Sequence, residues 1–117
     1  MSKCLPPIAR CLGSIILAGL ATVASPATAQ NPNSGNFWLS LCQESHPSCT
    51  GYLAAIGDFH SLSGLSLFCA PKTVTTGQMQ AVVTKYLRDN PAELHEPFVV
   101  LIVRASQKAF PCPRKSN

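Results

Sequence analysis

Cysteine and histidine are the residue types with which this 117-residue chain could carry out chemistry, and it has six cysteines and three histidines. Cys42, His46 and Cys49 lie close enough together to suggest a zinc site. However, the chain has no Cys-x-x-Cys pair and no second cluster of ligands, and a thioredoxin-like redox centre would also need that pair. We therefore expect no metal and no cofactor, and we favour disulfide bonds as the role of the cysteines.

The first 29 residues have the order of a secretory signal peptide. Lys3 and Arg10 make the N-terminus positive, and residues 12–23 form an uncharged apolar run. Small residues then occupy the positions that a signal peptidase reads, in Ala27-Thr28-Ala29. The alternative is a membrane anchor, but a run of about 12 residues is shorter than the roughly 20 needed to span a bilayer. We predict cleavage after Ala29 and export to the periplasm, with no membrane span in the mature chain.

Cleavage would leave one small domain. Removing 29 residues from 117 leaves 88, which is too few for a core alone to give a wide margin of stability. Four cysteines would remain, and in an exported domain they predict two disulfides: Cys42, Cys49, Cys69 and Cys112. The mature chain would carry seven basic and five acidic residues, which gives a net charge of +2. The basic residues are scattered, apart from a short tail at 114–117, so we expect no nucleic-acid surface.

Apolar residues recur at helical spacing in the first half of the mature chain. After a flexible polar lead-in at residues 30–35, we predict one helix over 36–44 and a second over 49–60. Ser48 is expected to cap the second helix. This helix also carries four small residues, Gly51, Ala54, Ala55 and Gly57. They predict that another helix approaches it closely.

The third helix is the most strongly marked. Thr75 and Gln78 match a capping box, in which each side chain satisfies a free backbone N–H of the first turn. Apolar residues then recur with the helical period, at Met79, Val82, Val83, Tyr86 and Leu87. Pro91 ends the helix, because proline cannot continue it.

A fourth helix is predicted from Pro97, which suits the first helical turn, to Ala109 or Phe110. Residues 98–103 could form a strand by propensity, but their continuation into a polar segment favours a helix. Apolar residues cover most of the circumference of this helix. It is therefore either central in the fold or covered by a partner, and the second alternative suggests a homodimer surface.

Four helices joined by short links predict an all-α, up-down bundle stapled by disulfides. In that arrangement Cys42 and Cys49 lie at one end, and Cys69 and Cys112 lie at the other. We therefore favour the pairs Cys42–Cys49 and Cys69–Cys112. The alternative pairing, Cys49–Cys69 with Cys42–Cys112, requires the connection at residues 61–68 to fold back along the second helix.

No group of residues in the mature chain has the arrangement of a catalytic site. A nucleophile needs a base within hydrogen-bond reach and a group that orients the base. We expect His46 to be an exposed turn residue and His60 to lie at a helix end. Asp58 is expected to cap the connection after the second helix. Tyr52 and Tyr86 are expected in the core with their hydroxyls at its edge, and we predict that the protein is not an enzyme.

A set of short motifs follows a characteristic order along the mature chain. It comprises Cys49-x-Gly51-Tyr52-Leu53 with Asp58, Phe68-Cys69-x-Pro71, Val74-Thr75-x-Gly77-Gln78, Val82-Val83-x-Lys85-Tyr86-Leu87, Pro91 with His95, and Ala109-Phe110-Pro111-Cys112. In this order the chain resembles the Rap/Tai family of type VI secretion immunity proteins, from about Leu41 to Pro113. Ala55 stands where the family's second glycine is expected, and Gly57 follows two residues later.

The resemblance implies a helical immunity domain over residues 36–113, in a periplasmic protein without catalytic activity. Family members studied as immunity proteins bind and inhibit a peptidoglycan amidase toxin from neighbouring bacteria. They commonly do so as a homodimer that occludes a cysteine–histidine active site, although many relatives have no known effector. A periplasmic stress protein or acid chaperone is the alternative of a different class, because such proteins are also small, helical and disulfide-bonded.

For the partner contact we favour the segment from Arg88 to Pro97, which joins the two strongest helices and concentrates charged groups. Its two prolines stiffen it, which lowers the entropic cost of binding. The alternative is a solvated loop without a binding role. The predicted contact residues are Arg88, Asp89, Asn90, Glu93, His95 and Glu96.

Overall fold

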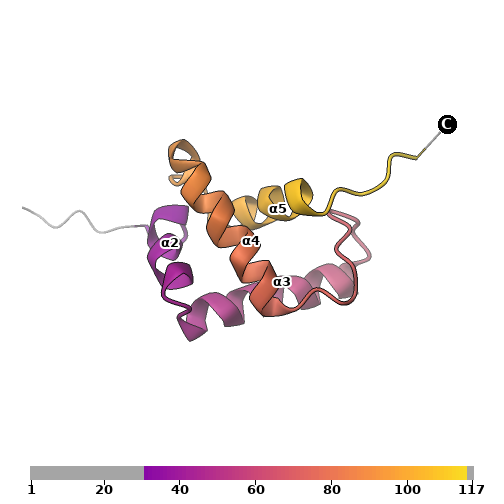
Figure 1. Ribbon diagram of the computed structural model, residues 1–117, viewed down its shortest axis with the longest axis horizontal. Helices are drawn as coiled ribbons and strands as arrows, with labels where there is room; N and C mark the ends of the chain where they lie inside the picture. The colour runs from indigo at the N-terminus through magenta and orange to yellow at the C-terminus, as the bar shows by residue number, and fades with distance from the viewer. Residues whose placement is uncertain (1–30, 116–117) are drawn as a thin grey trace, which may run out of the picture.

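The structure, a computed structural model, describes residues 31–115 and is all-helical over that range (Figure 1). It contains α2 (Gly35–Gln43), α3 (Pro47–Ser63), α4 (Thr76–Asp89), the short 3-10 helix η3 (Pro91–Glu93) and α5 (Phe98–Ala109). The predicted all-α fold with four main helices is therefore confirmed. The predicted signal peptide, the first residue of the lead-in and the end of the basic tail lie outside the described residues.

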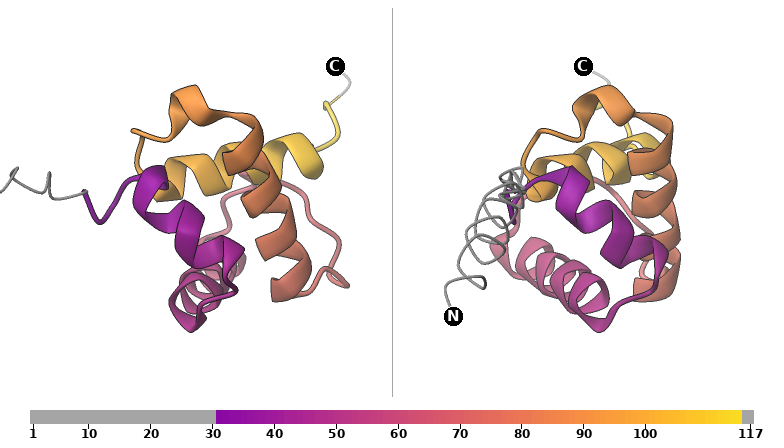
Figure 2. Two further views of the ribbon diagram at one scale, coloured as in Figure 1. Left: turned by 60° about the vertical axis from the view of Figure 1, so that its left-hand side comes forward. Right: turned by 90° about the vertical axis from the view of Figure 1, so that its left-hand side faces the viewer.

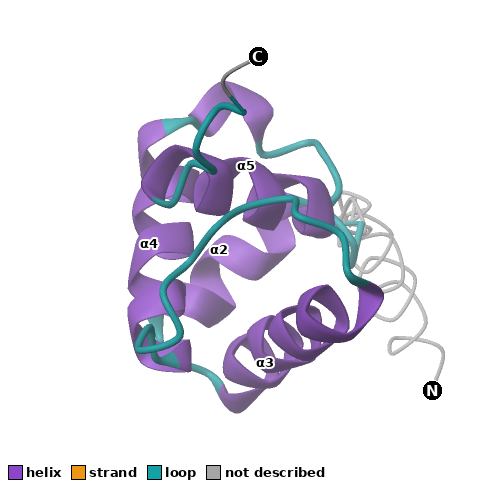
Figure 3. Cartoon of the chain, turned by 90° about the vertical axis from the view of Figure 1, so that its right-hand side faces the viewer, coloured by secondary structure: helices purple, strands orange, loops and turns teal. Residues whose placement is uncertain are grey.

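Helix α4 is the centre of the fold, because it packs against α2, α3 and α5. Its Val83 and Leu87 are fully buried, and α5 adds Leu101 and Ile102 to the same core. Figures 1 and 3 show α4 crossing its neighbours obliquely, with α5 above and α3 below in both views. The arrangement therefore differs from the predicted up-down bundle. The helices have unequal lengths, nine residues in α2 and 17 in α3, which prevents side-by-side packing along their whole length.

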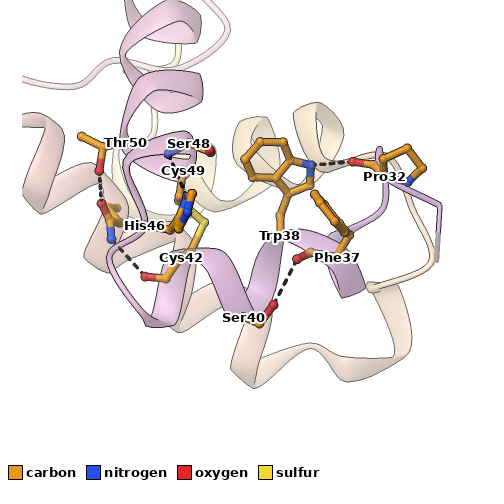
Figure 4. The surroundings of a disulfide bond; sticks show 10 residues. Pro32, Phe37, Trp38, Ser40, Cys42, His46, Ser48, Cys49 and Thr50 are labelled. Carbon is orange, nitrogen blue, oxygen red and sulfur yellow. Dashed lines mark hydrogen bonds between the residues drawn. A yellow bond between two sulfur atoms is a disulfide. The ribbon is translucent and has the colours of Figure 1, made fainter. Parts of the chain in front are cut away.

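An aromatic cluster joins α2, α3 and α5 at the edge of this core. The Trp38 indole stacks on Phe98 with ring centroids 4.8 Å apart and planes 7° apart, and Tyr52 packs against both rings. The indole N–H donates to the Pro32 carbonyl at 2.8 Å (Figure 4). This bond fastens part of the predicted flexible lead-in to α2.

A buried disulfide, Cys42–Cys49, closes the corner between α2 and α3 and confirms the first predicted pair. Both cysteines are at most 2% exposed, and their Cα atoms lie 5.2 Å apart. Gln80 of α4 lies beside this bond. Its amide N–H donates to the Cys42 carbonyl at 3.0 Å, and its amide oxygen accepts from the Thr50 hydroxyl at 2.9 Å. One side chain of α4 therefore holds the end of α2 and the start of α3 together.

Helix α3 begins two residues earlier than predicted, and the prediction that Ser48 caps it is wrong. Pro47 occupies the first helical position, where its missing N–H is not needed, so His46 becomes the N-cap. The His46 ring accepts a hydrogen bond from the Ser48 N–H at 3.2 Å (Figure 4). His46 itself is exposed in the turn, as predicted.

Helix α3 also runs three residues further than predicted, to Ser63. It ends at Gly64, whose φ of 68° is the left-handed conformation that favours glycine after a helix. Asp58 therefore lies within the helix and not at its end. Its side chain is exposed and forms no hydrogen bond with the residues that the structure describes. The prediction that Asp58 caps the connection is wrong.

The small residues of α3 do not receive another helix of this chain, so that prediction is also wrong. Gly51 and Gly57 are exposed, and a Cβ atom added to either would meet nothing within 4 Å. The buried residues of α3 are Cys49 and Leu53. Gly51 lies on the opposite face of the helix, whereas Ala54 and Gly57 lie beside Leu53 and line a cleft next to the long connection. The small residues of α3 therefore do not form one face for helix packing.

The predictions for the starts of α4 and α5 have different outcomes. The capping box of α4 is confirmed: Thr75 accepts from the Gln78 N–H at 3.1 Å, and the Gln78 side chain accepts from the Thr75 N–H at 2.8 Å. Helix α5 confirms the helical alternative, but Pro97 is its N-cap and not a residue of its first turn. The apolar stripe of α5 packs against α4 and α2. Val99 lies outside this contact and is 39% exposed. This helix is therefore central in the fold.

The second disulfide, Cys69–Cys112, confirms the other predicted pair, with Cα atoms 4.8 Å apart. It joins residues 43 positions apart in sequence. Beside it, the Cys69 N–H donates to the Phe110 carbonyl at 2.9 Å, and the Gln107 side chain donates to the Leu67 carbonyl at 3.0 Å. The long connection between α3 and α4 is thereby fastened to the end of α5 (Figure 3).

Gly35, the first residue of α2, is a glycine that the packing requires. A Cβ atom here would collide with the Leu101 side chain and lie 3.2 Å from the Leu94 carbonyl oxygen. We predict that Gly35→Ala lowers the free energy of unfolding by about 1–3 kcal/mol, measured by urea denaturation. Gly51→Ala is the matched control, and should raise it by up to about 1 kcal/mol because its new methyl group meets no neighbour. Equal stability of the two variants would contradict this account.

Candidate functional site

The segment predicted to contact a partner is fastened to the start of α2 through its backbone. The Gly35 N–H donates to the Glu96 carbonyl at 3.0 Å, and the Asn36 N–H donates to the Leu94 carbonyl at 2.9 Å. The Leu94 side chain is buried in the core. The segment after α4 is therefore a fixed part of the fold and not a freely moving loop.

The acidic residues of this segment face Arg104 of α5. The Arg104 guanidinium donates to Glu93 Oε2 at 3.1 Å and to Glu96 Oε1 at 3.0 Å. The Tyr86 hydroxyl of α4 donates to the same Glu93 oxygen at 2.8 Å. These four side chains, which we call the Arg104 cluster, tie the segment to both α4 and α5.

The pKa values of three members of the Arg104 cluster are shifted: Glu93, Tyr86 and Arg104. The hydrogen bond from Tyr86 holds the pKa of Glu93 below its usual value of 4.5, and the bond from Arg104 acts in the same direction. Burial, followed by the contact with Glu93, raises the pKa of Tyr86. The hydrogen bonds to Glu96 and Glu93 raise the pKa of Arg104. At neutral pH Glu93 is therefore ionised, whereas Tyr86 and Arg104 stay protonated and can donate to it.

Three further predicted contact residues lie at the end of α4. Arg88 is exposed, and Asp89 pairs with Lys85 one turn earlier, which lowers the pKa of the Asp89 carboxyl. The Asn90 side chain donates to the Tyr86 carbonyl at 2.8 Å and so closes the last turn of the helix. Arg88 and Asp89 are thus both exposed, and Asp89 differs from Arg88 in being paired with Lys85.

His95 completes the predicted set. Its exposed ring lies 3.0 Å from the Ala92 carbonyl. Of the six predicted contact residues, the structure thus brings Glu93 and Glu96 together through Arg104 and leaves Arg88 and His95 at the surface. Figure 2 shows this segment at the opposite edge of the molecule from α3.

Sequence reasoning assigned no role to Arg104. It is the one charged residue among residues 98–107, and a lone cation in an apolar helix signals that acidic partners lie nearby. Lys108 follows one turn later, with its amine 5.9 Å from the centre of the Tyr86 ring. The helix predicted to be apolar around most of its circumference therefore also positions the partner segment.

A cleft of about 300 Å³ lies between α3, the long connection and α4. The His60 ring stacks on Phe68 in its wall, with ring centroids 4.1 Å apart. The Nε2 atom of His60 is buried and has no hydrogen-bond partner within residues 31–115. The hydrogen bonds of the other two histidines go to backbone atoms, and the four cysteines of this range are paired with each other.

The family profile of Rap1a immunity proteins matches residues 34–112, a range that includes every helix described above. The chain belongs to this family. The predicted resemblance is therefore confirmed, and membership indicates an immunity protein directed against a secreted effector. Rap1a immunity proteins are generally not enzymes. No curated protein and no solved structure matches the chain significantly.

The helices of this immunity domain are short or interrupted by polar residues. Across residues 31–115, no helix has both the length and the apolar character needed to cross a membrane.

The lowered pKa of Glu93 predicts a pH-dependent contribution to the stability of the immunity domain. Its folded-state pKa lies below the unfolded value, so the stabilisation is present above about pH 4.5 and is lost as the pH falls through the folded-state value. We predict that Glu93→Gln lowers the thermal unfolding midpoint at pH 7, and that the difference from the wild type shrinks between about pH 5 and pH 3.

Glu44→Gln is the control for this measurement, because the Glu44 side chain is exposed and makes no hydrogen bond within the described range. It should leave the pH profile of the wild type unchanged. Parallel profiles of the wild type and Glu93→Gln across the whole acid range would show that Glu93 does not stabilise the fold through its charge.

Proposed function

We propose that this chain is a periplasmic immunity protein that binds and inhibits a peptidoglycan amidase delivered by type VI secretion. Its membership of the Rap1a immunity protein family, over residues 34–112, is the observation that carries this proposal. The two disulfides support an oxidising compartment, and the signal-peptide pattern of residues 1–29 supports export to the periplasm. A peptidoglycan amidase would act in that same compartment.

Inhibition would use the rigid segment after α4, which enters the effector's active-site cleft and blocks substrate. The Arg104 cluster and the backbone bonds to α2 fix its shape before binding. Such preorganisation reduces the entropy that association would otherwise lose. The segment also lies at an edge of the molecule, where it can reach into a concave surface (Figure 2).

The six predicted contact residues then divide into two roles. Glu93 and Glu96 position the segment through Arg104, and Asn90 closes the last turn of α4. The exposed side chains of Arg88 and His95 contact the effector, and the Lys85-paired Asp89 lies beside them. The exposed residues would thus govern affinity directly, whereas the positioning residues would act through the shape of the segment.

The test is complex formation between the full-length chain, expressed with export to the periplasm, and an amidase effector encoded beside its gene. We expect a stable complex by light scattering and loss of peptidoglycan hydrolysis on titration. The variant Arg88→Ala with His95→Ala should bind at least about tenfold more weakly, which is about 1.4 kcal/mol. Lys72→Ala is the matched control, because Lys72 is an exposed cation in the long connection and should bind normally.

Two results would count against the proposal. If the wild-type protein neither binds nor inhibits the amidase, the proposed function is wrong. If the wild-type protein binds but the double variant binds equally well, the effector contacts a different surface.

A further inference from the structure

The two disulfides of this chain differ in their exposure. Cys42 and Cys49 are 2% and 0% exposed, whereas Cys69 is exposed and Cys112 is half-buried. Thiol–disulfide exchange begins when a thiolate attacks one sulfur of the bond, so its rate depends on access to that sulfur. Of the two bonds, Cys69–Cys112 is therefore the one that is open to exchange.

The residues around the exposed disulfide favour its opening. Lys72 lies three positions after Cys69, and Arg114 and Lys115 lie two and three positions after Cys112. Neither cysteine has an acidic residue within three positions in the sequence. Nearby positive charge stabilises the thiolate that leaves when the bond breaks, and a more stable leaving group speeds exchange.

The surroundings of Cys112 also suit the opened state. Its Sγ atom lies 3.9 Å from the Ser66 carbonyl oxygen. A disulfide sulfur has no proton to donate, but the thiol formed on opening can donate weakly to this oxygen. The bond from the Cys69 N–H to the Phe110 carbonyl and the burial of Phe68 hold the connection without help from the disulfide. The two sulfurs therefore stay close when the bond is open, so that it can form again.

Apolar side chains beside this disulfide offer a surface for a protein. The Gln107 side chain holds the Leu67 carbonyl, which places this part of the connection at the end of α5, just before Cys112 (Figure 3). Four large side chains are exposed in the connection or in the helix end that leads into it: Phe59 at 60%, Leu62 at 87%, Leu65 at 52% and Leu67 at 39%. Large apolar side chains that gather at one place are typical of a contact surface.

We propose that Cys69–Cys112 is the site at which a thioredoxin-fold oxidoreductase exchanges disulfides with the folded chain, and that Leu65 and Leu67 form its docking surface. The chemistry of the site identifies this partner, because an exposed disulfide next to an apolar surface fits a protein that carries a reactive Cys-x-x-Cys dithiol. The proposal does not depend on the identity of any effector.

The exchange proceeds in two steps. A thiolate of the oxidoreductase forms a bond to the sulfur of Cys69, the more exposed cysteine of the pair, and the bond between Cys69 and Cys112 breaks. Cys112 leaves as a thiolate and takes up a proton. The second thiol of the oxidoreductase then attacks the mixed disulfide and frees Cys69 as a thiol. Two electrons thereby pass from the partner's dithiol to this chain, and the reverse reaction forms the bond again.

The first test locates the mixed disulfide. It uses the full-length chain after export to the periplasm, purified with both disulfides formed. Reduced thioredoxin whose second active-site cysteine is replaced by serine stops the reaction after the first step, and peptide mapping then identifies the cysteine to which it is attached. We expect attachment to Cys69, with Cys42 and Cys49 still paired. No mixed disulfide, or attachment to any other cysteine, would overturn the proposal.

A second measurement separates docking from simple accessibility. Leu65→Ser with Leu67→Ser should slow reduction by thioredoxin, kept reduced by its reductase and NADPH, at least about tenfold because an apolar contact is lost. Reduction by dithiothreitol needs no docking surface and should stay within about twofold of the wild-type rate. Val99→Ser is the matched control, since Val99 is as exposed as Leu67 but lies at the start of α5.

The Val99→Ser variant should be reduced by thioredoxin at the wild-type rate. Equal thioredoxin rates for the wild type and the double leucine variant would overturn the proposal. An equal loss of rate with thioredoxin and with dithiothreitol would also overturn it, because the substitutions would then act through access to the disulfide and not through docking.

Discussion

The buried junction formed by the Cys42–Cys49 disulfide and Gln80 is the constraint on which the rest of the structure depends. Helix α2 has only nine residues, too few to be stable alone, and the disulfide fixes its end against the start of α3. Gln80 then holds this corner against the central helix α4. Because the junction between α2 and α3 is fixed, the first residues of α2 lie where they donate backbone hydrogen bonds to the segment after α4. The same junction sets the direction of α3 relative to the core.

Local signals in the sequence were sufficient for much of the fold. The Thr75–Gln78 capping box and the apolar period after it predicted α4, because both act within one or two turns. The two predicted disulfide pairs are confirmed, although the up-down bundle from which they were inferred is not the arrangement observed. The extent of α3 was predicted less well. The helix begins at Pro47 with His46 as its N-cap, and it continues to Ser63 before Gly64 ends it in the left-handed conformation.

The candidate site depends on contacts that no local signal specifies. The segment after α4 was recognised from its charges and prolines, but Glu93 and Glu96 turn inward because Arg104 lies across from them in α5. Likewise, Gly51 and Gly57 predicted a close helix contact, but a Cβ atom at either position would meet nothing within 4 Å. Which face of α3 is buried depends on where α4 crosses it, and this crossing follows from the junction at Gln80.

The resulting molecule separates two surfaces: a rigid polar segment before α5, and an exposed disulfide with apolar side chains beside it after the end of α5. The central claim is that a member of the Rap1a immunity protein family protects a cell in the periplasm. The most direct measurement is growth of a bacterial host that exports the amidase effector while it produces either the full-length chain or one lacking residues 1–29. The account predicts that only the full-length chain restores growth. Equal protection by both chains, or none by the full-length chain, would contradict it.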